Sequence, residues 1–136
     1  MALIEWNKAL YGVDVARFDE DHKKLLDFIN QLHESMLQGK GKEKLTEILV
    51  ALQQYTRYHF AEEEKEMRNV GYPDVEAHIQ LHQTLTDQLG KYISDFENNK
   101  REVSIETFRF LKEWLFNHIQ VADKKYVPWM KAKQSS

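Results

Sequence analysis

Apolar residues recur every three or four positions along four segments of this chain, and short polar stretches separate the segments. The segments run from about residue 19 to 38, from about 43 to 69, from about 73 to 96 and from about 104 to 127. Strand-like alternation of apolar and polar residues is scarce. We therefore predict four helices of about 20–27 residues, each roughly 30–40 Å long at 1.5 Å per residue.

Glycine, proline and serine mark the ends of the predicted helices. Gly39 follows the first segment and Gly71 the second, and a helix commonly ends at such a residue. Pro73 suits the first turn of the third helix, because an N–H at that position would have no partner in the helix. Ser104 is a suitable N-cap for the fourth helix. Only short linkers remain between the segments.

Short linkers make successive helices antiparallel. We therefore predict an all-α fold, an antiparallel up-down-up-down four-helix bundle over about residues 19–127. Residues 1–18 are expected to form an N-terminal arm that packs on the bundle through apolar side chains, and a short C-terminal tail should follow the bundle. The apolar residues of the arm include Trp6, Leu10, Tyr11 and Val13. The 136 residues are expected to make one domain.

The composition argues against several classes of function. A net charge of −3 offers no basic surface for nucleic acid or an anionic membrane. No apolar run is long enough to cross a bilayer, and the N-terminus lacks the basic start and apolar stretch of a signal peptide. The expected location is the cytoplasm. The absence of cysteine excludes disulfides and thiolate ligands, so any metal must be held by nitrogen and oxygen.

Histidines and acids that can bind metal fall on the apolar stripes of the predicted helices. Two pairs are spaced by four residues, which places both side chains of a pair on one helix face. Each buried imidazole or carboxylate without a partner would cost several kcal/mol. A metal centre would supply the missing partner. The candidate ligands are His22, His59, Glu63, His78, His82, His118 and Asp123.

The candidate ligands also agree in direction. They fall at the start of the first and third helices and in the second half of the second and fourth. In an antiparallel bundle these four places lie at the same end. His33 faces roughly inward as well, but it lies about 16 Å further along the first helix than His22. We predict that His33 is a rim or hydrogen-bonded histidine outside the centre.

Other metal-site patterns do not match this chain. His78 and His82 have the spacing of a zinc protease motif, but Ile79 occupies the place of the general-base glutamate. No histidine has a glutamate three residues before it, as ferritin-like di-iron proteins require. Five imidazoles and two carboxylates suit iron, zinc or copper by donor type. Their number exceeds the coordination of one ion and points to two.

Four motifs follow one another along the chain: His22 in the first helix, H-F-x-x-E at 59–63, H-x-x-x-H at 78–82 and H-x-x-x-x-D at 118–123. In these motifs the chain resembles the hemerythrin family over nearly its whole length. Trp6 and the segments 12–14 and 18–25 resemble the bacterial branch in particular. Asp21 departs from the pattern, since a longer Gln or Glu is commoner there. This difference is expected to alter a hydrogen bond to a ligand from outside the ligand set, and it leaves the ligands themselves unchanged.

The resemblance implies a non-haem di-iron centre that binds dioxygen reversibly. One iron would be held by His78, His82 and His118, the other by His22 and His59, with Glu63 and Asp123 bridging both. The two iron ions, as Fe²⁺ or Fe³⁺, would share a bridging hydroxide or oxide. The iron with two histidines would keep the open position that separates a reactive metal site from a structural one. The expected walls of a dry dioxygen pocket are Leu115, Ile119, Trp114 and Phe60.

The expected function is therefore dioxygen carriage, storage or delivery to an oxygen-using enzyme, so we expect a binding protein and not an enzyme. Two alternatives stay open at this point. A di-iron enzyme could act on peroxide or nitric oxide, although the chain offers no acid, base or redox residue for the pocket beyond the ligands. A sensor of dioxygen or iron would need a separate partner, because few residues follow Asp123.

Overall fold

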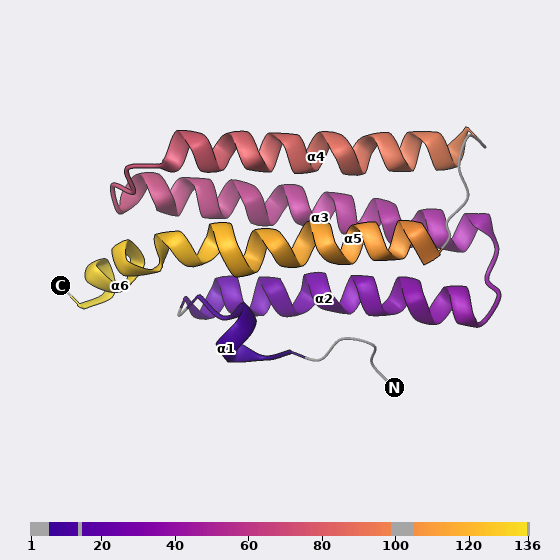
Figure 1. Cartoon of the computed structure of the whole chain (residues 1–136), viewed down its shortest axis with the longest axis horizontal. Helices are drawn as coiled ribbons and strands as arrows, with labels where there is room; N and C mark the ends of the chain where they lie inside the picture. The colour runs from indigo at the N-terminus through magenta and orange to yellow at the C-terminus, as the bar shows by residue number, and fades with distance from the viewer. Residues whose placement is uncertain (1–5, 14, 99–104, 136) are drawn as a thin grey trace.

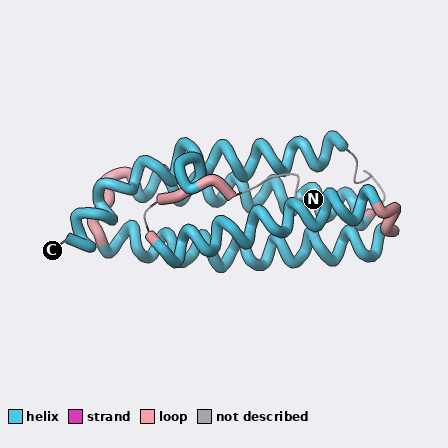
Figure 2. The backbone as a smooth tube through the Cα atoms, turned by 90° about the horizontal axis from the view of Figure 1, so that it is seen from below, coloured by secondary structure: helices cyan, strands magenta, loops and turns pink. Residues whose placement is uncertain are grey.

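The computed structural model describes residues 6–13, 15–98 and 105–135, and these residues contain no strand. Most of them belong to four long helices: α2 (Ala16–Leu37), α3 (Lys42–Asn69), α4 (Val75–Glu97) and α5 (Ile105–Asn117). The helices lie lengthwise beside one another, as Figure 1 and Figure 2 show from two directions. The predicted all-α four-helix bundle is confirmed.

The helices pack through their apolar stripes. Successive bundle helices run antiparallel, α2 contacts both α3 and α5, and α3 also contacts α4. Fully buried members of the main core include Leu25, Ile29, Leu49, Leu89 and Leu111. A second, smaller apolar cluster includes Phe18, Met67, Tyr126 and Met130. Each fully buried aliphatic side chain of this kind contributes about 1.5–3 kcal/mol to folding, so the stripes hold the bundle together.

Two glycines end the first two bundle helices as predicted. Gly39 has a φ of 69° and Gly71 a φ of 70°, in the left-handed region that favours glycine. After α3, the N–H of Tyr72 donates to the carbonyl of Met67 and that of Gly71 to Arg68. This pair of bonds is a Schellman motif, and the same pattern follows α2. Both turns reverse the chain within a few residues, which makes the neighbouring helices antiparallel.

The prediction that Pro73 occupies the first turn of the third helix is wrong. The helix begins at Val75, and Pro73 lies in the turn before it. The N–H of Val75 donates to the carbonyl of Tyr72, so Pro73 takes the second position of a four-residue turn, where its restricted φ is also favourable. The predicted N-cap Ser104 lies outside the described residues.

The fourth predicted helix is not one regular helix. After α5 the chain forms a π-helical turn, η1 (His118–Ala122), and a 3₁₀ turn, η2 (Asp123–Tyr126). A further helix, α6 (Val127–Ser135), follows where we expected a short tail. The N–H of Asp123 donates to the carbonyl of His118, five residues back. Periodicity missed this change because one wider turn hardly alters the apolar pattern.

The part of the N-terminal arm that the structure describes, residues 6–13 and 15–18, packs on the bundle. Its short helix α1 (Lys8–Tyr11) contacts α2 and lies below it in Figure 1. Tyr11 and Val13 are buried and Trp6 packs against the core, whereas the side chain of Leu10 is not among those described. The ammonium of Lys124 donates to the carbonyl oxygen of Gly12 at 2.6 Å. This bond holds the arm beside η2 and hence beside the predicted metal ligands.

Candidate metal centre

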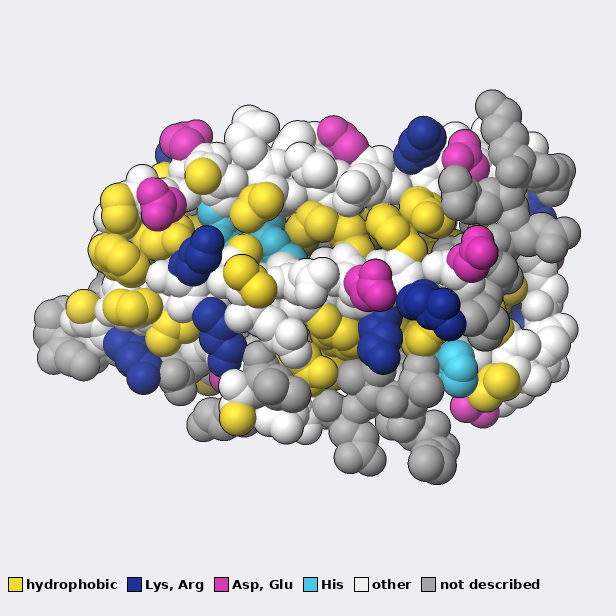
Figure 3. All heavy atoms as spheres, viewed as in Figure 1, with side chains coloured by type: hydrophobic (Ala, Val, Ile, Leu, Met, Phe, Trp, Pro, Cys, Tyr) yellow, Lys and Arg dark blue, Asp and Glu magenta, His cyan; other side chains and the backbone are white. Residues whose placement is uncertain are grey.

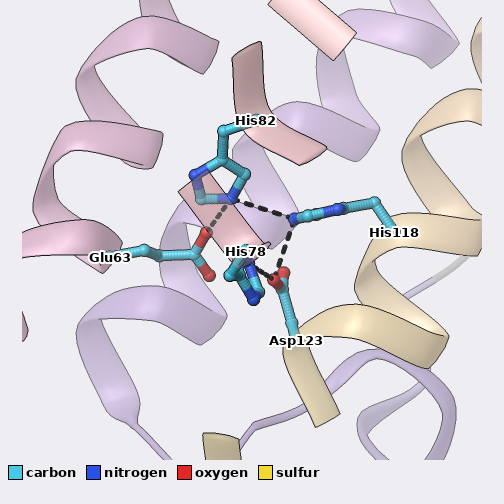
Figure 4. Close-up of side chains that lie close together, drawn as sticks. All are labelled: Glu63, His78, His82, His118 and Asp123. Atoms are coloured by element: carbon cyan, nitrogen blue, oxygen red, sulfur yellow. Dashed lines mark hydrogen bonds and ion pairs between the residues drawn. The ribbon is translucent and has the colours of Figure 1, made fainter. Parts of the chain in front are cut away.

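The seven predicted ligands meet at one end of the bundle, where α2 and α4 begin and α3 ends; Figure 1 shows these helix ends at the left. One comes from α2, two from α3, two from α4, one from η1 and one from η2. All seven are buried, with exposed fractions between 0% and 6%. Figure 4 shows five of them pointing toward one another. Their convergence follows from the antiparallel order of the helices that carry them.

The donors form two groups that share both carboxylates. The first group contains Glu63, His78, His82, His118 and Asp123. The second contains His22, His59, Glu63 and Asp123. Within each group, one donor atom from every residue lies within 4.8 Å of all the others. We call them the three-histidine half and the two-histidine half of the site. Two sets of donors that share two carboxylates suit a pair of metal ions.

Each shared carboxylate turns one oxygen toward each half. Glu63 Oε1 lies 3.3 Å from His82 Nε2, while its Oε2 lies 3.3 Å from His59 Nε2. Asp123 Oδ1 lies 3.0 Å from His118 Nε2, and its Oδ2 lies 3.2 Å from His22 Nε2. The two carboxylates therefore have the orientation that bridging ligands of two cations need.

The π-helical turn brings His118 and Asp123 together. Residues five apart on an α-helix point about 140° away from each other at 100° per residue. The wider turn takes up one extra residue, so Asp123 points about where the fourth residue after His118 would on an α-helix, and its carboxylate approaches the imidazole of His118 (Figure 4). Such single π turns occur frequently at functional sites. Here the turn brings the second shared carboxylate, that of Asp123, into the site.

Six buried polar atoms in this site have no hydrogen-bond partner in the described part of the chain. They are Nε2 of His22, His59 and His78, Oε1 of Glu63 and both carboxylate oxygens of Asp123. Several of these imidazole nitrogens and carboxylate oxygens lie 3.0–3.6 Å from one another, yet they are not aligned for hydrogen bonds. Buried groups in this position are costly. Their lone pairs converge on the spaces between them, as metal-ligand atoms do, so the donor set fits a pair of metal ions.

Three of the five histidines have an outer partner on Nδ1. His22 faces the carbonyl oxygen of Tyr11 at 3.2 Å. His59 faces the carboxylate of Asp21 at 2.9 Å, and His82 that of Glu64 at 2.8 Å. When Nδ1–H donates to such an oxygen, Nε2 keeps its lone pair for a metal. Asp21, noted above for departing from the family pattern, makes this outer bond.

Sequence reasoning missed three residues beside the ligands. The hydroxyl of Tyr126 donates to Glu63 Oε2 at 2.7 Å, and that of Tyr55 donates to Asp21 at 2.6 Å. Glu64 was the third. None of them carried a signal, because a lone tyrosine or a second glutamate on a helix is ordinary. Only the packing of different helices shows which side chains reach the ligands.

The outer acids also balance charge. Glu63 and Asp123 are shared, Asp21 adds a carboxylate behind the two-histidine half and Glu64 adds one behind the three-histidine half. Two divalent ions would bring a charge of about +4 into a buried site, which is costly unless it is neutralised. Four carboxylates, two inside and one behind each half, supply the opposite charge.

The shared carboxylates also control the protonation of the imidazoles. Burial by itself lowers the pKa of His22, but Asp123 and Glu63 overcome that effect and raise it to about 10. In the same way, Glu63 and Asp21 outweigh the burial of His59 and raise its pKa to about 9. Burial raises the pKa of Glu63 and Asp123, yet the imidazoles beside them hold both below the ordinary carboxyl range. These carboxylates therefore favour positively charged partners.

The four predicted pocket residues are all buried. Leu115 and Ile119 are 1% exposed and belong to the main core. Phe60 stacks on the ring of His82 with centroids 3.8 Å apart, which places it against the three-histidine half. The indole N–H of Trp114 donates to the carbonyl of Leu85 in α4. These positions are compatible with an apolar wall, and their role in dioxygen binding stays a prediction.

His33 lies apart from both halves, as predicted. It is absent from both groups of donors, and its ring lies 4.9 Å from that of Phe108. It is half-buried rather than enclosed.

A groove of about 490 Å³ lies between α4 and the α5–η1 segment and reaches His118. Leu81, Leu85, Phe110 and Val121 contribute to its apolar lining. Figure 3 shows hydrophobic side chains along this hollow, with histidine atoms at its floor. The three-histidine half is therefore the half closer to this surface.

Comparison with known proteins agrees with the class that the fold and the site define, a four-helix bundle with a shared histidine–carboxylate cation site. The family model described as the hemerythrin HHE cation binding domain matches residues 13–130. The bacteriohemerythrin of Methylococcus capsulatus is 37% identical over 97% of this chain and 100% of its own length. The myohemerythrin of Theromyzon tessulatum is 30% identical over 90% and 89%. The chain belongs to the hemerythrin family.

A solved structure supports the same conclusion for the fold. A wild-type hemerythrin crystal structure superposes with a TM-score of 0.88 at 36% identity and covers 95% of this chain and 98% of its own. The bacteriohemerythrin of Stenotrophomonas maltophilia is a further relative, 32% identical over 97% of this chain. The resemblance stated from the motifs is thereby confirmed.

Inserting one alanine after Gln120 should separate His118 from Asp123. Gln120 is exposed in the π-helical turn, and one more residue there would turn Asp123 by about 100° away from His118. We expect the variant to keep its helical circular dichroism and to lose metal binding. Gln120→Ala, which keeps the number of residues, is the control. Metal content equal to wild type in the insertion variant would contradict the role given to the turn.

Protein stripped of metal by a chelator should lose stability as the pH rises from about 6.5 to about 10. The raised pKa values of His22 and His59 stabilise the fold below the unfolded value of about 6.5, and this stabilisation is lost as the pH passes about 9 to 10. The lowered pKa of Glu63 acts at the other end, since its contribution is present above about 4.3 and is lost in acid.

Urea denaturation at pH 6 and pH 9 measures this change, and His22→Asn should reduce it. A wild-type free energy of unfolding that is higher at pH 9 would contradict the assignment. Because metal binding must displace the protons of these imidazoles, the same pKa values predict that acid weakens metal binding.

Proposed function

We propose that this protein binds dioxygen reversibly at a non-haem di-iron centre. The observation that carries the proposal is the division of seven buried donors into two groups that share Glu63 and Asp123. One iron would be held by His78, His82 and His118, the other by His22 and His59, with both carboxylates bridging. Membership in the hemerythrin family supports iron as the metal and a binding protein rather than an enzyme.

The chain offers the two ions unequal donor sets. The two-histidine half has one imidazole fewer, so a metal ion held there would keep an open position for a small ligand. When bound, an iron pair joined by hydroxide or oxide supplies two electrons to dioxygen on passing from Fe²⁺ to Fe³⁺ and recovers them on release. The protein's own task is to orient the donors and to keep water away from them.

Orientation and dryness come from the residues around the ligands. Tyr126 is fully buried and donates to Glu63 Oε2, the oxygen on the two-histidine side. This bond holds that carboxylate in its bridging orientation. Leu115, Ile119, Trp114 and Phe60 would exclude water from the dioxygen pocket, and their burial supports this role.

The wider setting is also part of the proposal. We infer a single domain over residues 1–136, a cytoplasmic location and a role in dioxygen carriage, storage or delivery to an oxygen-consuming enzyme. In the ranges that the structure covers, no helix has the length and apolar character needed to cross a membrane. Turnover of peroxide or nitric oxide with a reductant would instead favour the enzymatic alternative.

An optical spectrum of the reduced protein, recorded without dioxygen and then as dioxygen is added and removed, tests the proposal directly. The same preparation should contain two irons per chain, because the site has two donor groups. His78→Ala and His118→Ala should each lose the centre, since each removes an imidazole from the three-histidine half.

His33→Ala is the matched control and should keep both the iron content and the spectrum, because His33 lies outside both groups. One metal per chain in protein from iron-sufficient cells would contradict the proposal.

Leu115 should determine how long the oxygenated form lasts. It lies one helical turn before His118 and is 1% exposed, so it can shield the ligands from water. We expect Leu115→Ala and Leu115→Asn to keep two irons, to oxidise faster in air and to bind azide more readily. The decay of the oxygenated spectrum at equal iron loading measures this. An unchanged decay rate in both variants would indicate that Ile119, Trp114 or Phe60, rather than Leu115, excludes water from the pocket.

A further inference from the structure

Tyr55 ends a chain of hydrogen bonds that leads from the flank of the bundle to the two-histidine half. Its hydroxyl donates to Asp21 Oδ1 at 2.6 Å, and Asp21 Oδ2 lies 2.9 Å from His59 Nδ1. Both oxygens of one carboxylate are therefore engaged, one with the tyrosine and one with the histidine. The chain connects α3 to α2 and back to α3, since Tyr55 and His59 lie one turn apart on α3.

The two-histidine half depends heavily on this connection. Its other histidine, His22, is oriented by the backbone carbonyl of Tyr11, which no side-chain rotation can remove. His59 is oriented instead by the side chain of Asp21, which has two rotatable bonds and is 14% exposed. The bond from Tyr55 restricts those rotations. A half with only two imidazoles has no third one to compensate if His59 is poorly oriented.

The three-histidine half is supported differently. His82 faces Glu64, whose side chain is 28% exposed, and two further imidazoles share the same ion. Misorientation of one imidazole in three removes a smaller share of the donors there. The two halves should therefore respond unequally to the loss of an outer hydrogen bond.

We propose that Tyr55 is a positioning residue that, through Asp21, sets the affinity of the two-histidine half for its metal ion. At metal concentrations that already fill the three-histidine half, this tyrosine thus determines how much of the two-histidine half is also occupied. The inference rests on the proposed di-metal site and adds to it an order of loading, in which the three-histidine half fills first.

The ring of Tyr55 is suited to this position. It is half-buried, packs 5.9 Å from Phe28 and 5.8 Å from Tyr58, and lies under the ammonium of Lys24 at 5.7 Å. These contacts hold the ring from several sides, so removal of the hydroxyl alone should leave the packing of the ring in place.

Calorimetric titration of the chelator-stripped full chain with Co²⁺ alone, without dioxygen, tests the proposal. Wild type should bind two ions with separable affinities. Tyr55→Phe should lower the affinity for the second ion by about tenfold or more, which is the usual effect of losing an outer partner of a metal ligand. The affinity for the first ion should be unchanged. In the Zn²⁺-loaded protein, the Nδ1–H proton of His59 should also exchange faster with water in this variant.

Three further variants separate positioning from a general structural role. Tyr58→Phe removes the same hydroxyl one turn away from a ring that is 55% exposed, and it should bind both ions as wild type does. Glu64→Gln should lower the affinity for the first ion and not for the second. Asp21→Asn should lower the affinity for the second ion. Adding Tyr55→Phe to it should lower that affinity little further, because both substitutions break the same series of hydrogen bonds.

The outcomes are distinct. Tyr55→Phe protein that binds both ions with wild-type affinity, or loses affinity for both equally, overturns the inference. Wild-type protein that binds a single ion overturns the proposed di-metal site itself.

Discussion

Two carboxylates buried among five imidazoles are the constraint on which the rest of this structure depends. Glu63 and Asp123 are fully buried, and their oxygens face imidazole nitrogens on both sides. The free-energy cost of removing such charges from water is offset only when cations lie beside them. The site therefore has to bind metal, or protons in its place, and both the raised pKa of His22 and the unpartnered donor atoms express this requirement.

The four-helix bundle meets that constraint by bringing distant segments to one end. Two Schellman turns reverse the chain after α2 and α3, so helix starts lie beside helix ends. A π-helical turn then corrects the direction of one residue, Asp123. The arm completes the site, because the carbonyl of Tyr11 orients His22 and Lys124 holds the arm in place. Global topology brings the donors together, and local irregularities aim them.

The two halves of the site are unequal in ways that suit a reactive centre. The three-histidine half has more donors, is stacked against Phe60 and lies near the surface groove at His118. The two-histidine half has fewer donors and is more completely enclosed, since His22 and His59 are 0% and 1% exposed. A deficit of donors in the drier half is what a pocket for a small neutral ligand requires.

The sequence by itself determined the fold class, the four helical segments and the seven candidate ligands, because helical periodicity and i, i+4 spacing are local properties. It also placed His33 outside the site from the rise along one helix. Tertiary structure alone decided the rest. The π-helical turn depends on one backbone bond, and the start of α4 after Pro73 depends on a turn that competes with the helix. Tyr55 and Tyr126 act only across helix interfaces, where packing chooses the partner and no spacing along the chain records it.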